Sequence, residues 1–379
     1  MDIPPFELER WFDEYEPDAD LMLAESGVRS LDADRFDLDV GEMGYVIPTD
    51  GDPTFRADIA DRHGRDAEEV VLTCGTQEAD FLGFLSLVDE GDHAVVVAPT
   101  YQSLESVPAS VGSVTTVETE PPEWDLDVDA VADAMRPETR LVVLTNPSNP
   151  TGRYYGPETM RALYDLVADH DADGRRGGSG PGAGTSVGGG HGTYLFVDEV
   201  YRMLAPDPHE PAAALGPHAI SAAGVSKSYG LAGARLGWLV AEPAVADAVR
   251  RWKDYTTISP PKLGQHVAKQ AMGAQEAEIL DANRAHAAGN RERVAAFLEE
   301  YGMEWYEPTG VNGFPTLPEG FDSGKEFCRS LVEAESVVLA PGELFGHPDR
   351  FRIGFGLHTH ELEEGLARVG RHVESVRSN

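Results

Sequence analysis

Lys227 is the residue whose type most needs a chemical explanation. The chain has only five lysines, against twenty-five arginines, so its basic charge is almost always carried by arginine. Arginine keeps its proton and forms no imine, whereas a desolvated lysine can lose its proton and condense with an aldehyde. Lys227 is therefore a candidate for a covalent bond to a carbonyl group. A surface lysine in a glycine-rich loop is the alternative interpretation.

An acidic and an aromatic residue follow another apolar run. Asp198 comes directly after residues 194–197, and Tyr201 lies three residues further on. A carboxylate in this place can hold the proton on a ring nitrogen, and the tyrosine can donate a hydrogen bond to a nearby oxygen. The alternative for Asp198 is a solvated acidic residue at the end of a strand.

Two turns rich in glycine and proline also offer polar groups. Asn149 lies in the string 146–152, where prolines fix the backbone so that its amide can point into a cleft. Gly75, Thr76 and Gln77 lead from a predicted strand into a predicted helix, and free N–H groups at a helix N-terminus bind phosphate. A rigid turn and a simple helix cap are the alternatives.

Four further side chains complete the set of candidates. Ser226 and Arg235 flank the candidate lysine and can contribute to a phosphate site, the arginine by charge-assisted hydrogen bonds. Tyr101 follows the apolar run 94–97 and offers an aromatic face to a ring. Arg352 lies among apolar residues and can grip a carboxylate at two points, unless it pairs with a buried acid instead.

Together these groups meet the five demands of pyridoxal 5'-phosphate (PLP): an imine lysine, an anion for the ring nitrogen, donors for the phenolic oxygen, a stacking face and a phosphate cup. Over residues 45–360 they occur in the order typical of PLP-dependent aminotransferases, and the chain resembles class I and II of that family, of fold type I. The resemblance implies three catalytic residues, Lys227, Asp198 and Tyr201. It implies these cofactor-binding residues: Gly75, Thr76, Gln77, Tyr101, Asn149, Asp198, Tyr201, Ser226, Lys227 and Arg235. It implies Arg352 and Asn149 as substrate-binding residues, and no metal.

Short β-rich runs alternate with helical patterns between residues 70 and 240, which predicts an α/β fold with a mostly parallel sheet. The predicted strands are 70–72, 94–97, 141–144, 194–197, 220–225 and 236–240. The predicted helices are 77–88, 128–135 and 157–170. Ligands bind beyond the carboxyl ends of such strands, and the candidate residues fall just after them.

The domain organisation follows from pattern and resemblance. We expect an N-terminal arm at 1–44, with a helical pattern in 5–24, that packs on a smaller domain. A large PLP-binding domain with a seven-stranded type of sheet is expected at 45–260, interrupted by a flexible glycine-rich loop at 173–192. Residues 261–379 are expected to form an interdomain helix and the smaller α/β domain, with strands at 337–339 and 351–354.

The resemblance implies ping-pong transamination from an L-amino acid to a 2-oxo acid through an internal aldimine on Lys227, whose pKa we expect to be lowered by its surroundings. Aspartate and glutamate are the default substrates, for which Arg29, Arg153 and Lys253 are unranked candidates for a second cation. One alternative is a PLP-dependent synthase or lyase of the same fold, such as an amino-acid-cyclising enzyme of the capreomycidine-synthase type. The other is a non-catalytic PLP-binding regulator.

The chain departs from the family pattern in two places. The family usually has a tyrosine five residues before the glycine of a Gly-x-Pro segment, where it reaches the phosphate of the neighbouring subunit. Here Tyr45 lies six residues before Gly51. The usual entry segment that forms the substrate lid is not recognisable in residues 24–44.

Composition bounds the partners and the compartment. The net charge of −36 opposes binding to nucleic acid or to an anionic membrane, and an acidic excess with so few lysines suggests adaptation to high salt. The two cysteines, Cys74 and Cys328, suit no disulfide framework. We therefore expect a soluble, cytoplasmic, halophilic protein, and the resemblance implies a homodimer.

Overall fold

A seven-stranded sheet organises the larger part of the molecule. The computed structural model describes residues 2–174 and 192–378, so 175–191, most of the predicted glycine-rich loop, lie outside the described residues. The strand order is β2-β8-β7-β6-β5-β3-β4, and all neighbours are parallel except where β8 meets β2 and β7. The bounds are β2 Val70–Thr73, β3 His93–Ala98, β4 Ser113–Glu118, β5 Thr139–Thr145, β6 Tyr194–Asp198, β7 Ala219–Gly224 and β8 Gly237–Val240.

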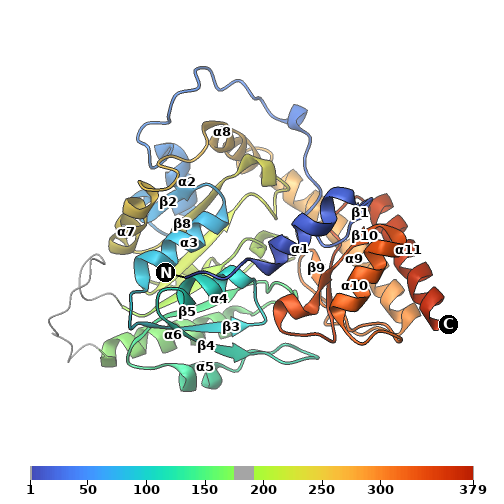
Figure 1. Ribbon diagram of the computed structural model, residues 1–379. Helices are drawn as coiled ribbons and strands as arrows, with labels where there is room; N and C mark the ends of the chain where they lie inside the picture. Colours follow the sequence, from blue (N-terminus) through green and yellow to red (C-terminus); the bar gives the residue numbers. More distant parts are fainter. Residues whose placement is uncertain (1, 175–191, 379) are drawn as a thin grey trace.

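Both faces of this sheet are buried because its strands are apolar at nearly every position. Along β3, for example, Val96 packs into the core on one face, and Val95 and Val97 pack into the core on the other. One face carries α3 Thr76–Leu87, α4 Gln102–Ala109 and α7 Pro243–Lys253. The other face carries α2 Pro53–His63, α5 Val128–Ala134, α6 Pro157–Gly174 and α8 Lys262–Ala271 (Figure 1).

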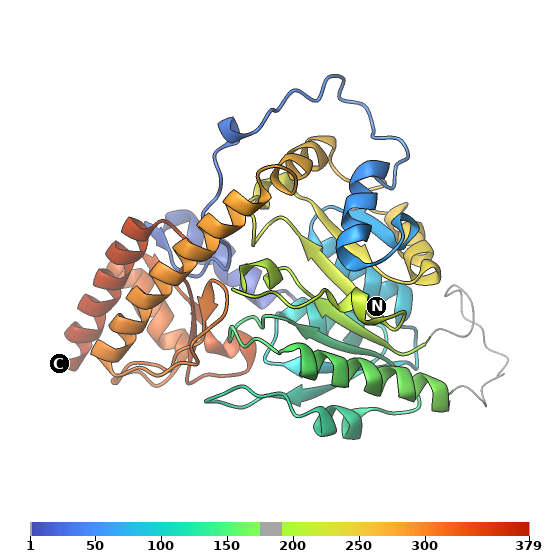
Figure 2. The ribbon, with the colours of Figure 1, turned by 180° about the vertical axis from the view of Figure 1, so that it is seen from behind.

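The smaller part of the molecule has its own core. It contains α10 Gly324–Glu335, α11 Thr359–Arg377, β9 Asn312–Gly313, β11 Ala340–Pro341 and β12 Phe351–Gly354, together with a two-stranded pairing of β1 Leu21–Met22 with β10 Val337–Val338. The 26-residue helix α9, Glu276–Tyr301, runs from beside α8 to beside α11 and so connects the two parts (Figure 2).

The N-terminal helix α1, Glu7–Tyr15, packs on this smaller core rather than on the large sheet. Leu8 and Trp11 are buried there, and Trp11 Nε1 donates a hydrogen bond to the carbonyl oxygen of Leu339 at 2.9 Å. The helix is shorter than the pattern in 5–24 suggested, since the chain becomes irregular after a short 3-10 turn and then forms β1.

The fold class expected from the sequence is confirmed. All six predicted strands of the large sheet occur within two residues of their expected bounds, and the three predicted helices occur as α3, α5 and α6. The seventh strand, β4, was not predicted, because it lies at the sheet edge with several half-exposed polar residues. Within the described residues, no helix is long and apolar enough to cross a membrane.

Candidate active site

Lys227 lies in the turn that follows β7, at the carboxyl edge of the large sheet. Its Nζ donates a hydrogen bond to Glu25 Oε1 at 2.7 Å, and its side chain is 25% exposed. Burial alone would lower the pKa of this amine, but the negative charge of Glu25 and the proximity of Tyr201 raise it overall. The expectation of a lowered lysine pKa is therefore wrong for this arrangement, in which an ion pair retains the proton.

Arg352 reaches the same place from β12. It is 2% exposed, and its guanidinium donates to Asn149 Oδ1 at 3.0 Å and to the carbonyl oxygen of Ala24 at 2.8 Å. Its Nε is buried and has no hydrogen-bond partner, and within the described chain Arg352 forms no ion pair with an acidic residue. A buried cation without a carboxylate partner is costly, so this guanidinium suits a carboxylate that arrives from outside.

Tyr201 lies near both of these cations. Its hydroxyl donates to Ser26 Oγ at 2.9 Å, and its ring is buried. Burial raises the pKa of the Tyr201 hydroxyl, while the nearby charges of Lys227 and Arg352 lower it. The predicted residues Lys227, Tyr201, Asn149 and Arg352 are thus brought together, although they come from segments far apart in the sequence.

An irregular segment, residues 23–31, lines this group and was not recognised in the sequence. Its backbone binds β12 on one side, where Gly354 N donates to the carbonyl oxygen of Leu23 at 2.6 Å. On the other side Leu31 N donates to the carbonyl oxygen of Gly230, beyond Lys227. Residues 23–31 therefore connect β12, the strand of Arg352, to the lysine turn.

Two glycines allow this segment to approach β12. A Cβ atom on Gly354 would lie 1.9 Å from the carbonyl oxygen of Glu25, and one on Gly356 would lie 2.0 Å from that of Gly27. No other residue type fits such a backbone contact. The glycine spacing just after Arg352 was the available signal that another chain segment packs there, and it was overlooked.

Asp198 ends β6 and is 7% exposed. Its Oδ1 accepts a hydrogen bond from Val200 N at 3.0 Å, which leaves Oδ2 for another donor. Burial raises the pKa of Asp198 to about 7; the Val200 N–H lowers it, the Glu199 carboxylate raises it and Lys227 lowers it. A protonated ring nitrogen placed against this carboxylate would favour its ionised form.

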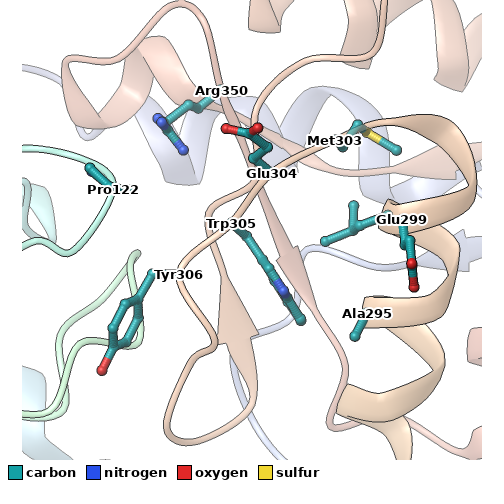
Figure 3. A pocket seen from close by; sticks show the side chains of 9 residues that line it. Pro122, Ala295, Glu299, Met303, Glu304, Trp305, Tyr306 and Arg350 are labelled. Atoms are coloured by element: carbon teal, nitrogen blue, oxygen red, sulfur yellow. The ribbon is translucent and has the colours of Figure 1, made fainter.

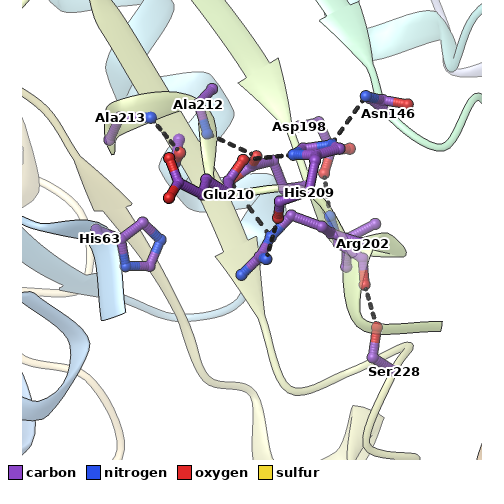
Figure 4. A network of polar contacts seen from close by, with 12 residues as sticks. His63, Asn146, Asp198, Arg202, His209, Glu210, Ala212, Ala213 and Ser228 are labelled. Carbon is purple, nitrogen blue, oxygen red and sulfur yellow. Dashed lines mark hydrogen bonds and ion pairs between the residues drawn. The ribbon is translucent and has the colours of Figure 1, made fainter. Parts of the chain in front are cut away.

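A network of polar contacts fixes the turn that carries Asp198 and Tyr201 (Figure 4). Glu199 Oε1 accepts from Ala212 N at 2.8 Å, and Arg202 Nη1 donates to the carbonyl oxygen of His209 at 2.8 Å. Ser228, next to Lys227, donates to the carbonyl oxygen of Val200 at 2.8 Å. The turns that present Asp198 and Lys227 are thus joined directly.

Arg235 lies against the N-terminus of α3. Gly75, with φ of 86°, precedes the helix, and a Cβ atom on it would lie 2.5 Å from Arg235 Nη2. Thr76 Oγ1 is buried and has no hydrogen-bond partner. Arg235 donates only to the carbonyl oxygens of Ala232 and Cys74, and within the described residues it has no acidic partner. Free N–H groups, a free guanidinium and an unpartnered hydroxyl fit a phosphate group.

The other predicted cofactor residues lie nearby with less specific contacts. Ser226 is half-buried beside Lys227. Gln77 is exposed at the start of α3, where its Oε1 accepts from Ser103 Oγ at 3.2 Å. The Tyr101 hydroxyl donates a hydrogen bond to Glu9 of α1 at 3.1 Å. Burial raises the pKa of this hydroxyl and the nearby charge of Arg352 lowers it, so the N-terminal helix approaches the site here.

The three candidates for a second substrate cation differ. Arg153 pairs with Asp125, and Lys253 is buried and donates to the carbonyl oxygen of Leu72, so both are already engaged. Arg29 belongs to the lining segment, and its Nη1 is buried without a partner. Of the three, Arg29 is thus the one with a buried nitrogen that has no hydrogen-bond partner.

Tyr45 and a surface pocket at the end of α9 stand apart from this site. Tyr45 is 67% exposed, on a stretch of chain that bulges away from the large sheet. A pocket of 420 Å³ between the end of α9 and residues 303–306 contains Arg350, two residues before Arg352, but none of the predicted site residues (Figure 3).

Comparisons with known proteins agree with this geometry. The sequence matches the family described as aminotransferase class I and II over residues 32–172 and 189–369. It is 32% identical to capreomycidine synthase of Streptomyces vinaceus, over 97% of this chain and 93% of that protein. It is 27% identical to aspartate/prephenate aminotransferase of Thermus thermophilus, over 90% and 86%.

Solved structures share the fold. A PLP-dependent aminotransferase from Streptococcus suis superimposes with a TM-score of 0.88 at 25% identity, over 99% of both chains. The PLP-dependent cyclase OrfR superimposes with a TM-score of 0.84 at 28% identity, over 99% of this chain and 98% of that one.

Proposed function

Because this chain belongs to the class I and II aminotransferases, a PLP-dependent family, we propose that it moves an amino group from an L-amino acid to a 2-oxo acid by a ping-pong mechanism. The observation that carries the proposal is the convergence of Lys227, Asp198 and a buried Arg352 without an acidic partner. Arg352 supplies a grip for the α-carboxylate that every such substrate has in common.

The residues fit PLP in a defined orientation. The N-terminus of α3 and Arg235 would hold the phosphate, and Asp198 Oδ2 would face the ring nitrogen. Tyr101 would stack on the ring, while the amide of Asn149 and the hydroxyl of Tyr201 would face the phenolic oxygen. When bound, PLP supplies an aldehyde that condenses with amines and a ring that accepts electrons from the substrate's α-carbon.

Lys227 Nζ would move a proton from the substrate's α-carbon. To accept that proton it must first lose its own, which Glu25 and Tyr201 retain in this structure. Residues 23–31, which carry Glu25, also bind the strand of Arg352. A substrate carboxylate that binds Arg352 would therefore act on the strand that contacts this segment.

The substrate side chain is the finer part of the proposal. Aspartate and glutamate are the default by family, and Arg29 would bind the second carboxylate. The Glu25 carboxylate beside Lys227 opposes a second negative charge, so neutral and basic amino acids belong in the same panel.

A second candidate function is a PLP-dependent synthase or lyase reaction on the same substrate complex, including cyclisation. The 32% identity to capreomycidine synthase and the likeness to a PLP-dependent cyclase favour it, because both span nearly the whole chain. Arg352, Asp198 and Lys227 serve either reaction, so product analysis separates the two.

A homodimer in a salt-rich cytoplasm belongs to the same proposal. Exposed apolar side chains support a second copy, because they gather on two stretches beside the large sheet. They are Leu38, Met43, Tyr45, Ile47, Trp252, Tyr255, Ile258 and Leu263.

The test is the visible absorbance of the PLP-loaded protein in high salt, recorded as single amino acids are added without any oxo acid. Transamination predicts conversion of the absorbance band by a donor and its recovery on addition of a 2-oxo acid. A band that never converts with any amino acid would contradict the proposal. Mass spectrometry of the products decides between a 2-oxo acid and a cyclised or eliminated product.

A further inference from the structure

Asp80 is a buried acid that the proposed mechanism does not use. It lies in the second turn of α3, is 2% exposed, and its Oδ1 is buried with no hydrogen-bond partner among the described residues. An ionised carboxylate without a partner in such a place is strongly disfavoured, so the group keeps its proton. Its surroundings therefore determine what a neutral carboxyl group does there.

The packing of α3 on the sheet brings Asp80 and Asp198 to a similar level near the carboxyl edge. A Cβ atom on Gly83 would lie 2.7 Å from Phe196 Cε2, so the helix contacts β6 directly at that point. Phe196 and Asp198 point to the same face of the sheet because they are two residues apart on one strand. The helix begins at the carboxyl edge of the sheet, so Asp80 lies about 4.5 Å nearer that edge than Gly83. Asp198 lies about 6.6 Å nearer that edge than Phe196.

The two carboxyl groups influence each other electrostatically. Burial is the largest cause of the raised pKa of Asp80, and the negative charge of Asp198 is the next. Asp198 is the member that ionises first, since its pKa is raised only to about 7 and is lowered by Lys227. The Glu199 carboxylate acts on Asp198 in the opposite direction.

Arg235, at the N-terminus of α3, donates to backbone carbonyl oxygens and has no acidic partner among the described residues, while charged groups on the neighbouring helices are engaged elsewhere. Strands β2, β7 and β8, which pack on α3, contribute no titratable side chain. On α7, Arg250 pairs with Asp247, Lys253 donates to the carbonyl oxygen of Leu72, and Arg251 is exposed. On α4, Glu105 is influenced by Glu118 rather than by Asp80.

We propose that Asp80 and Asp198 form a carboxyl pair that carries one proton and one negative charge, with Asp80 the protonated member. The pair rests on the proposed function for its catalytic meaning, since Asp198 Oδ2 faces the ring-nitrogen position. Two carboxyl groups that repel each other electrostatically resist a second negative charge, so the singly charged pair persists over a wide pH range. Asp80 is in this sense a positioning residue, whose neutral carboxyl group leaves Asp198 to carry the negative charge of the pair.

The sign of the pH effect follows from the direction of the shift. The folded state holds a proton on Asp80 that the unfolded state releases above about pH 4. As pH rises, the wild type therefore loses stability relative to Asp80→Asn, whose amide is neutral. The loss ends at the pH where Asp80 ionises in the folded state. For one proton, the ratio of the folding equilibrium constants of Asp80→Asn and wild type rises about tenfold per pH unit.

The experiment measures unfolding equilibria of the full-length protein between about pH 5 and about pH 9 at constant salt. The variants are Asp80→Asn, Asp198→Asn and the double variant, with Asp133→Asn, an exposed residue of α5, as control. We expect the Asp80→Asn ratio to rise with pH, and to stop rising at a lower pH in the Asp198→Asn background. A flat ratio, or an identical rise in both backgrounds, would overturn the pair.

Infrared spectroscopy gives a second measurement. At neutral pH the exposed acids are ionised, so the C=O stretch of a protonated carboxyl group isolates a buried acid. We expect this band in the wild type with and without PLP and a loss of intensity in Asp80→Asn; a wild type without the band, or a band that Asp80→Asn leaves unchanged, would overturn the proposal. If no amino acid is turned over, the proposed function fails while these results stand; if the band and the pH slope are missing, the pair fails while the function stands.

Discussion

The two halves of the candidate site are built in different ways. Gly75, Asp198 and Lys227, on the cofactor side, follow strands of one sheet, whose register places them at a common edge. Glu25 and Ser26, on the substrate side, lie on irregular backbone held by contact with two glycines after β12. Regular hydrogen bonding supports the first half and close packing supports the second. Mutations in the two halves should therefore impair different properties of the protein.

Replacing Lys227 should reduce turnover more than any other change, and it does not test the difference between the two halves of the site. Lys227→Ala removes the amine that moves the proton, so we expect turnover to fall by about 10²–10⁴-fold or more, with the fold retained. Steady-state assays and thermal unfolding measure both properties. Lys325→Ala, at an exposed lysine of α10, is the control, and full activity of Lys227→Ala would contradict the assignment.

Arg352→Lys tests the substrate half at its buried cation. The charge remains but the two-point grip is lost, so kcat/KM should fall by about 10²-fold or more while PLP still binds. Arg350→Lys is the matched control, because Arg350 donates to the carbonyl oxygen of Phe314 and faces the separate pocket of Figure 3. Equal losses in both variants would show that the effect is structural.

Gly354→Ala tests most directly whether the two halves of the site can be impaired independently. The added methyl group would meet the backbone at Glu25, so residues 23–27 must move, at a cost of about 1–3 kcal/mol. We expect KM for the amino acid to rise about tenfold or more, with little change in the dissociation constant of PLP. Gly289→Ala on α9, where only a flexible arginine lies nearby, should change neither quantity. A parallel loss of PLP binding would remove the distinction between the halves.

Glu25→Gln should have the smallest effect on turnover, below about tenfold. The Glu25 carboxylate raises the pKa of Lys227, so its loss should lower that pKa and make the neutral amine available at lower pH. The rate at which an amine-selective reagent modifies Lys227 in PLP-free protein, followed by mass spectrometry against pH, reports this shift. An unchanged pH profile would mean that the ion pair does not control the proton.

The same difference explains what could be predicted from the sequence. The composition of apolar runs such as 194–197 predicts strands, and a polar residue at the end of such a run must lie at the sheet edge. Asp198, Asn149 and Lys227 were therefore found together with the sheet that carries them. Residues 23–31 have no periodicity, and their position depends on contacts with β12 more than 300 residues away, which local pattern does not encode.

Asp80 was missed for a related reason. An acidic residue in a predicted helix is usually solvated, and helical periodicity does not show which face another element covers. Most positions of the helix are buried, and only the contact of Gly83 with Phe196 of β6 indicates that Asp80 lies near the level of Asp198. The pKa of Lys227 was misjudged because its partner, Glu25, comes from the unrecognised segment.

The scarcity of lysine has a practical consequence for chemistry with aldehydes. Of the four other amines on lysine side chains, Lys253 is buried, Lys269 pairs with Asp52, and Lys262 binds the carbonyl oxygen of Glu42. Lys325 remains as the exposed competitor. An aldehyde added to this protein thus meets very little background reaction, and its binding stoichiometry can be measured directly. For the same reason amine-reactive cross-linkers are poor probes of its assembly, which should be measured by light scattering or sedimentation instead.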